Sequence, residues 1–412
     1  MSEEKFKPVT LEDIQKAKEN IRGSAIVTPL KKSNYFSEVF KKNIFLKMEN
    51  LQNTGAFKIR GARNKLLSLT EAEKKKGVIT ASAGNHAQGV AYQATQLGIS
   101  STVVMSENTP MAKVLATRGY GAKVVLKGSN YDDAYQEALR IQKEKGLVFV
   151  HGYADPYIVA GQGTIGLEIL EQCPEVEAVV VPIGGGGLIS GISTAIKSLK
   201  PNVKIIGVQA AGAASMAESL NKGQPITLKN TYTMAEGIFV NQTSPYTFSM
   251  IQKNVDQILT VTDDEIAGAI LQLLEKAKIL VEGAGATTLA TLLTGKLAIP
   301  EKNICFVLSG GNLDVTTLSH VLERGMVTEG RMVKLSVTIN DKPGALHQLT
   351  KILSEIQANI MQVSHDRTTQ GVQFGKTRVD LTLETKGADH IEEILSSLQK
   401  AGYFVETFLN SR

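Results

Sequence analysis

Residues 54–62 read T-G-A-F-K-I-R-G-A and place Lys58 between an aromatic and an apolar residue. A lysine in such surroundings can lose part of its hydration, which lowers its pKa and makes the neutral amine available as a nucleophile. Gly55 and Gly61 flank it and allow a tight turn and the close approach of a bulky group. Most of the 45 Lys and Arg residues are expected to be solvated surface charges, and by default Lys58 would be one of them. The segments described below are what support Lys58 as a candidate nucleophile.

The composition of the chain limits the classes of protein it can belong to. Its 412 residues exceed the usual size of one core, so we expect two or three domains. The net charge of +5 is small and the basic residues are mixed with acidic ones, so we do not expect nucleic acid as a partner. No stretch approaches the roughly 20 apolar residues of a membrane span, so we do not expect a membrane either. Cys173 and Cys305 are the only cysteines, which favours a reducing cytosol and offers no metal-ligand spacing.

Strands and helices alternate along most of the chain. This rhythm predicts parallel sheets covered by helices, an α/β fold. The expected strands are 44–47, 78–80, 102–105, 123–126, 178–181, 205–208 and 304–308. The segment 210–245 is rich in Gly, Asn and Thr and is expected to be loop-like. The polar stretch 323–331 is expected to mark a domain boundary.

Beyond this boundary the pattern changes. Val333, Leu335, Val337 and Ile339 alternate with polar residues, which indicates a half-buried strand. The following segments predict the order βαββαβ in about 80 residues, the ferredoxin-like α+β plan.

A first Gly-containing segment, S-A-G-N-H-A-Q-G at residues 82–89, joins an expected strand to an expected helix. Free backbone N–H groups and the helix dipole at such a position favour an anion, and a small carboxylate would suit the space. The alternative is an ordinary helix cap by Ser82 or Asn85, with His86 in a structural role.

Two more segments follow strands in the same way. Gly184, Gly185, Gly186 and Gly187 precede Leu188 at a helix start, and a run of glycines is entropically costly but lets backbone wrap a phosphate. Ser309, in the sequence L-S-G-G-N, follows an apolar strand and is expected at the carboxyl edge of the sheet, where ligands of α/β folds bind.

Together these segments resemble the pyridoxal-phosphate enzymes of the β-elimination and β-replacement family, with the tryptophan synthase β-like fold of two subdomains, and among them the threonine dehydratases. The resemblance covers residues 10–320 and implies pyridoxal 5'-phosphate as the cofactor. It implies a Schiff base on Lys58, with Phe57 beside the ring, Asn85 at the ring hydroxyl, residues 184–188 at the phosphate and Ser309 at the pyridine nitrogen. The substrate is then expected at Ser82, Ala83, Gly84, Asn85 and His86.

Position 83 bears on the reaction type. Related serine racemases carry a serine there, which can handle a proton on the face opposite the lysine, whereas Ala83 cannot. The resemblance therefore favours elimination, namely deamination of L-threonine to 2-oxobutanoate and ammonia, with L-serine as a secondary substrate.

Residues 331–412 resemble an ACT-type regulatory domain. The signature turn D-x-P-G-x-L stands at residues 341–346, which makes Asp341, Gly344, Ala345 and Leu346 the candidate effector-binding residues. The alternative is a turn used only for oligomer packing. The resemblance implies a catalytic domain at 1–325 with a small subdomain at about 45–155, an amino-acid effector, and a dimer or tetramer.

Two functions therefore remain in competition. One is an amino-acid lyase that opens isoleucine synthesis, with serine racemase as a variant of it. The other is an amino-acid sensor in which the α/β body is only a scaffold.

Overall fold

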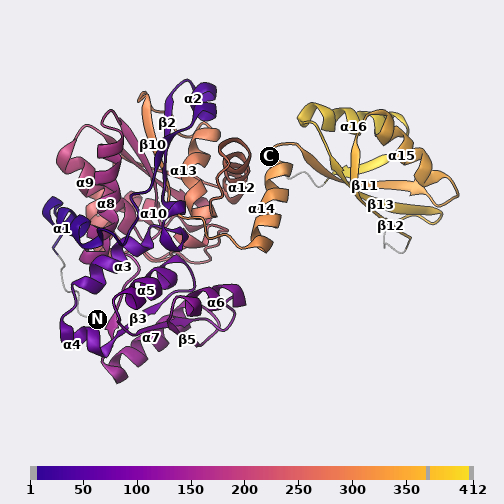
Figure 1. Ribbon diagram of the computed structural model, residues 1–412. Helices are drawn as coiled ribbons and strands as arrows, with labels where there is room; N and C mark the ends of the chain where they lie inside the picture. Colours follow the sequence, from indigo (N-terminus) through magenta and orange to yellow (C-terminus); the bar gives the residue numbers. More distant parts are fainter. Residues whose placement is uncertain (1–6, 368–371, 408–412) are drawn as a thin grey trace. The chain divides into compact units, whose positions relative to one another are not determined.

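The computed structural model describes residues 7–367 and 372–407, and the chain divides into two compact units, Met1–Thr317 and Leu318–Arg412 (Figure 1). The division falls within the helix α14, Val315–Thr328. The polar stretch at 323–331 therefore begins inside this helix, where Glu323, Arg324 and Thr328 are exposed. The predicted domain limits at residues 325 and 331 stay predictions.

The first unit contains two sheets, as its strand and helix alternation predicts. The larger sheet has six strands in the order β1-β2-β10-β7-β8-β9. All neighbouring pairs are parallel except β1 with β2. The strands are β1 Leu30–Lys32, β2 Asn43–Met48, β7 Ala178–Pro182, β8 Lys204–Ala210, β9 Gln257–Val261 and β10 Asn303–Leu308.

Helices pack around this sheet. They are α1 Leu11–Ile21, α2 Asn34–Phe40, α8 Pro156–Gln172, α9 Gly187–Leu199, α10 Ser215–Lys222, α11 Pro245–Asn254, α12 Asp263–Gln272 and α13 Gly283–Leu293. The first unit also has short helical turns, namely η1 Glu49–Leu51, η2 Asn53–Gly55, η3 Ala211–Ala213, η4 Glu236–Ile238 and η5 Leu273–Ala277. Helix α10 lies in the stretch 210–245, which was expected to be loop-like. The sequence does not reveal this helix because its buried residues, Ser215, Met216 and Ser219, include only one large apolar side chain.

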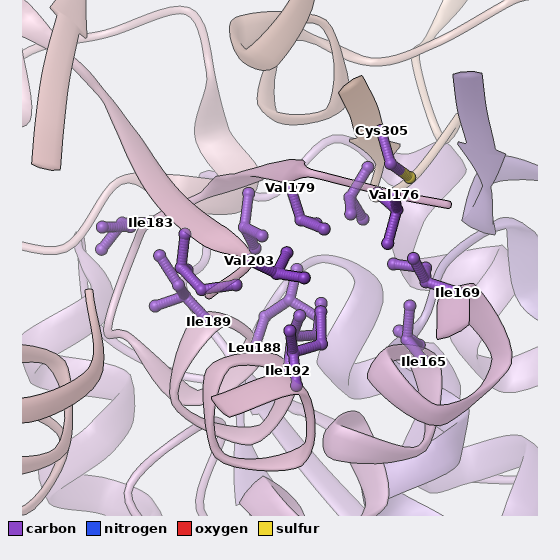
Figure 2. Packing of buried hydrophobic residues seen from close by; sticks show 14 of the residues in the cluster. Ile165, Ile169, Val176, Val179, Ile183, Leu188, Ile189, Ile192, Val203 and Cys305 are labelled. Atoms are coloured by element: carbon purple, nitrogen blue, oxygen red, sulfur yellow. The ribbon is translucent and has the colours of Figure 1, made fainter. Parts of the chain in front are cut away.

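The main core of the first unit lies between the large sheet and the helices α8 and α9. Figure 2 shows Val179 of β7 and Cys305 of β10 with side chains from both helices, including Ile165 and Ile192. Four of these residues are almost completely removed from solvent, and the positions 165, 169, 189 and 192 follow the spacing of buried helix faces.

The smaller sheet is entirely parallel, with the order β5-β4-β3-β6. Its strands are β3 Val78–Ala81, β4 Ser101–Met105, β5 Lys123–Leu126 and β6 Val148–Phe149. The helices of this part are α3 Lys58–Leu67, α4 Glu71–Lys76, α5 Asn85–Gln96, α6 Met111–Gly119 and α7 Tyr131–Lys145. The small subdomain predicted at about 45–155 contains this sheet, but its limits stay a prediction.

A buried ionic cluster connects β2 and η1 to helices α3 and α8. The guanidinium of Arg60 donates to both carboxylate oxygens of Glu49 at 2.8 Å and to Glu168 at 2.5 Å. Lys47 Nζ donates to the second oxygen of Glu168 at 2.5 Å. Two cations thus face two carboxylates in the core, and the cluster fixes α3, the helix that begins at Lys58.

The second unit has the predicted βαββαβ order. Its antiparallel sheet runs β12-β13-β11-β14. The elements are β11 Met332–Asn340, α15 Ala345–Glu355, β12 Asn359–Asp366, β13 Lys376–Glu384, α16 Ala388–Lys400 and β14 Phe404–Thr407. Val333, Leu335, Val337 and Ile339 are buried in its own core, as their alternation indicates.

Candidate active site

Lys58 lies in the wall of a cavity formed by segments far apart in the sequence. Its Nζ donates a hydrogen bond to the carbonyl oxygen of Gly152 at 3.0 Å and lies 5.0 Å from the centre of the Phe57 ring. Burial lowers the pKa of Lys58 to about 8, although the nearby Glu282 opposes this shift. A substantial fraction of the amine is therefore neutral near physiological pH, as a nucleophile requires.

The glycine run 184–187 forms one side of the same cavity. Gly186 caps helix α9 with φ of +89°, a conformation that favours glycine. A Cβ atom on Gly185 would lie 2.3 Å from the ring of Tyr153, and one on Gly187 would lie 2.8 Å from the carbonyl oxygen of Tyr153. The turn thus brings bare backbone and the first N–H groups of α9 to the cavity, a geometry that suits a phosphate.

The remaining predicted cofactor residues also line this cavity, which brings together Phe57, Lys58, Asn85, Gly184, Gly185, Gly186, Gly187, Leu188 and Ser309. Ser309 directly follows β10 and is 2% exposed, and its carbonyl oxygen accepts a hydrogen bond from the Phe57 N–H at 3.2 Å. The glycine run and Ser309 come together because β7 and β10 are parallel, so that their carboxyl ends lie at the same edge of the sheet.

The predicted substrate segment, residues 82–86, leads into helix α5. Gly84 is the helix cap and no side chain caps this helix, so neither Ser82 nor Asn85 has the capping role considered from sequence. Of the five predicted substrate residues, Asn85 lines the cavity described above, whereas Ser82, Ala83, Gly84 and His86 are not among its lining residues. Their role in substrate binding stays a prediction.

His86 is buried behind this segment. Its Nε2 donates to the carbonyl oxygen of Val150 at 3.0 Å, since a carbonyl can only accept. Burial and the charge of Lys58 lower the pKa of His86 to about 3. The ring is therefore neutral at physiological pH, which agrees with a structural role rather than proton transfer.

Sequence reasoning missed several residues of the site. Tyr153 lies against the glycine turn, and Gly152 supplies the carbonyl that accepts from Lys58. Glu282 is a buried carboxyl in the cavity wall. The sequence H-G-Y-A-D-P, residues 151–156, follows the strand β6 and could have indicated a further site loop.

The chemistry of the cavity matches the needs of pyridoxal phosphate. A buried amine of lowered pKa suits its aldehyde. The backbone of the glycine turn and the N-terminus of α9 suit its phosphate. Among the described residues, no group of three or more His, Cys, Asp and Glu side chains could hold a metal ion. Over the same part of the chain, no helix has both the length and the apolar composition needed to cross a membrane.

Comparison with known proteins identifies two families in the chain. Residues 21–310 match the pyridoxal-phosphate dependent enzyme family, and residues 328–403 match the ACT domain. A protein of Geobacter sulfurreducens named L-threonine ammonia-lyase is 51% identical over 400 residues, which are 97% of this chain and 99% of that protein.

Solved structures show the same fold. The processed form of threonine deaminase isoform 2 from Solanum lycopersicum is 38% identical, with a TM-score of 0.71 over 77% of this chain and 95% of that chain. Maize serine racemase is 34% identical, with a TM-score of 0.74 over 78% of this chain and 98% of that chain. The chain therefore belongs to the pyridoxal-phosphate dependent enzymes and carries an ACT domain that follows the catalytic region in the sequence.

Proposed function

We propose that the protein deaminates L-threonine to 2-oxobutanoate and ammonia. One observation carries this proposal: the cavity that contains Lys58 lies in a chain that is 51% identical, over 97% of its length, to a protein named L-threonine ammonia-lyase. The similarity includes the ACT region, so the two proteins share both parts.

Each segment of the site has its own proposed role. Bound pyridoxal phosphate would supply an electron sink that makes the Cα proton of an amino acid acidic. Lys58 would hold the cofactor through its aldehyde, and its Nζ would be the base that removes this proton. Residues 184–188 would bind the phosphate through backbone N–H groups, and Ser309 would contact the pyridine nitrogen. Residues 82–86, which lead into α5, would bind the substrate carboxylate.

Serine racemisation is the second candidate, because maize serine racemase shares the fold at 34% identity. Ala83 argues against it. Its side chain packs against the apolar cluster between α5 and β4 and has no group that could transfer a proton. L-serine is therefore proposed as a secondary substrate for deamination to pyruvate.

The ACT domain is proposed to bind an amino-acid effector at Asp341, Gly344, Ala345 and Leu346. Gly344 has φ of +87° and is the N-cap residue of α15, which has no side-chain cap, so bare backbone is available there. The side chains of Ala345 and Leu346 pack into the domain core, so these two residues would contact the effector through their backbone. Isoleucine is the first candidate, since threonine deamination would open its synthesis. An oligomer, dimer or tetramer, and a cytosolic location are also proposed.

The test is an assay of 2-oxo acid release from L-threonine and L-serine in parallel, with and without isoleucine, valine and AMP. The proposal expects release from both substrates, faster with threonine, and a change of rate with an amino acid. The sensor hypothesis expects effector binding without release of either 2-oxo acid. D-serine formation as the main reaction would favour the racemase instead.

A further inference from the structure

Glu282 is a carboxyl in the cavity wall to which the proposed reaction gives no role. It is 8% exposed and lines the cavity together with Lys58 and Asn85. Although it stands at the cap position of α13, its side chain makes no capping hydrogen bond. Its Oε1 instead accepts a hydrogen bond from Nδ2 of Asn85 at 2.7 Å. The carboxyl is thus directed to the site rather than to its own helix.

Glycine backbone surrounds this carboxyl. A Cβ atom on Gly310 would lie 2.4 Å from Oε1 of Glu282, and one on Gly237 would lie 3.1 Å from the same atom. Gly237 belongs to η4 and Gly310 follows β10, so two separate elements leave room for one side chain. This close fit holds the carboxyl in one place beside Asn85.

The other end of the Asn85 amide is fixed as well. Its Oδ1 accepts a hydrogen bond from Nδ2 of Asn312 at 2.7 Å, and the same Nδ2 donates to the carbonyl oxygen of Thr54 at 2.6 Å. A backbone carbonyl can only accept, so the group of Asn312 that faces it must be the NH₂. That group in turn requires the oxygen of Asn85, which places the NH₂ of Asn85 toward Glu282.

We propose that Glu282 is a positioning residue that, together with Asn312, locks the side-chain amide of Asn85 so that its second N–H is offered to the ring hydroxyl of pyridoxal phosphate. This inference rests on the proposed role of Asn85. Removal of the acceptor would free the amide to rotate, and the donor would then be lost for part of the time.

Burial and neighbouring groups together set the charge state of Glu282. Burial raises its pKa to about 7, the hydrogen bond from Asn85 lowers it, Glu236 of η4 raises it, and Lys113 of α6 and Lys58 of α3 lower it. Both charge states can accept from Asn85, but a hydrogen bond to an ionised carboxylate is the stronger one. The hold on Asn85 therefore tightens as pH rises through neutrality.

The test measures binding of pyridoxal phosphate to the cofactor-free protein, without any substrate. Glu282→Ala should weaken binding about 10-fold, which is within the cost of leaving a donor of this kind unpaired. Asn85→Ala should weaken it at least as much, and the double variant should equal Asn85→Ala within about two-fold. Glu282→Gln keeps an acceptor oxygen and should restore most of the affinity.

A matched control and a second readout separate positioning from general damage. Glu236→Gln removes a nearby carboxylate that makes no bond to Asn85. Measured above about pH 8, where Glu282 is ionised with or without Glu236, it should change the affinity less than about two-fold. The absorbance spectrum of the bound cofactor should shift with pH near 7 in the unchanged protein and lose this shift in Glu282→Gln. If Glu282→Ala fails to fold, two other variants provide the test. Glu282→Gln is read by the loss of the spectral shift, and Asn312→Ala by weaker binding of pyridoxal phosphate.

Two results would overturn the proposal. One is an unchanged affinity in Glu282→Ala, and the other is a double variant whose loss equals the product of the two single losses. Because no step uses threonine, a protein that passes this test but releases no 2-oxobutanoate would disprove the proposed reaction and leave the role of Glu282 intact.

Discussion

The ammonium group of Lys58 donates a hydrogen bond across 3.0 Å to the carbonyl oxygen of Gly152, a residue 94 positions further along the chain. Lys58 begins α3, whereas Gly152 follows the edge strand β6 of the small sheet. The amine is thus held by one backbone oxygen while burial lowers its pKa. A fixed and readily deprotonated amine is what capture of an aldehyde cofactor requires.

The first prediction concerns pH. Burial lowers the pKa of Lys58 to about 8, so the neutral amine predominates above that pH and the ammonium below it. The rate at which the cofactor-free protein captures pyridoxal phosphate should rise with pH and level off above about 8, read by absorbance after mixing. Nα-acetyllysine, as a control, should show a rate that still rises beyond that point. A protein rate that follows the control would contradict the lowered pKa.

The second prediction concerns the buried ionic cluster. Glu168→Ala removes the carboxylate shared by Lys47 and Arg60, and should lower the free energy of unfolding by about 3–5 kcal/mol because two buried cations lose a partner. Denaturant unfolding measures this change. Glu171→Ala on the same helix is the matched control, since it breaks an exposed pair with Lys18 that should contribute about 0–1 kcal/mol. A similar loss of unfolding free energy in both variants would show that the buried cluster stabilises the fold no more than the exposed pair does.

The third prediction concerns the glycine turn. In Gly185→Ala the new methyl group would meet the ring of Tyr153 at 2.3 Å, so the glycine turn or this ring would have to move at the proposed phosphate site. We expect binding of pyridoxal phosphate to weaken by about 10-fold or more, at a stability cost of about 1–3 kcal/mol. Gly268→Ala is the control, because the added carbon would meet no atom within 4 Å apart from the nearby backbone of its own helix, α12. Unchanged affinity in Gly185→Ala would exclude this turn as the phosphate site.

The fourth prediction asks why elimination is favoured over racemisation. If the missing acid at position 83 blocks racemisation, Ala83→Ser should gain detectable D-serine formation, measured by chiral chromatography after incubation with L-serine. The unchanged protein is the reference. If the variant forms no more D-serine than the reference does, other residues determine the outcome.

The fifth prediction concerns regulation. A chain that ends at Gly330 lacks the strand β11 and all later elements, and should keep deamination but lose its response to isoleucine. The effector must bind one state of the protein better than another, typically by about 5–150-fold in affinity. Rates with and without isoleucine are compared for both chains. An equal response in the shortened chain would place the effector site elsewhere.

Much of the site could be predicted because its residues stand in short local patterns. Glycines 184–187 and the sequence around Lys58 are unusual within a few residues, and each follows or precedes an element that periodicity predicts. Glu282 could not be found in this way. It is one of 40 acidic residues, and its partner Asn85 is 197 positions away, so only the folded chain reveals their contact.

The same holds for the fold: elements set by a local sequence pattern could be predicted, whereas elements set by contacts between distant residues could not. The strand β11 could be predicted from the alternation that ends at Ile339, because one of its faces is buried. Helix α10 was missed because its buried face includes the small polar residues Ser215 and Ser219. Its place is set by contacts such as the hydrogen bond from Ser219 Oγ to Thr243, which lies 24 positions away.

The most direct test of the account is the rate of 2-oxobutanoate release from L-threonine by Lys58→Ala, measured with saturating pyridoxal phosphate. The variant lacks both the group that holds the cofactor and the proposed base, so we predict a rate at least about 10³-fold below that of the unchanged protein, with the fold retained by circular dichroism. A rate close to that of the unchanged protein would contradict the central role of Lys58.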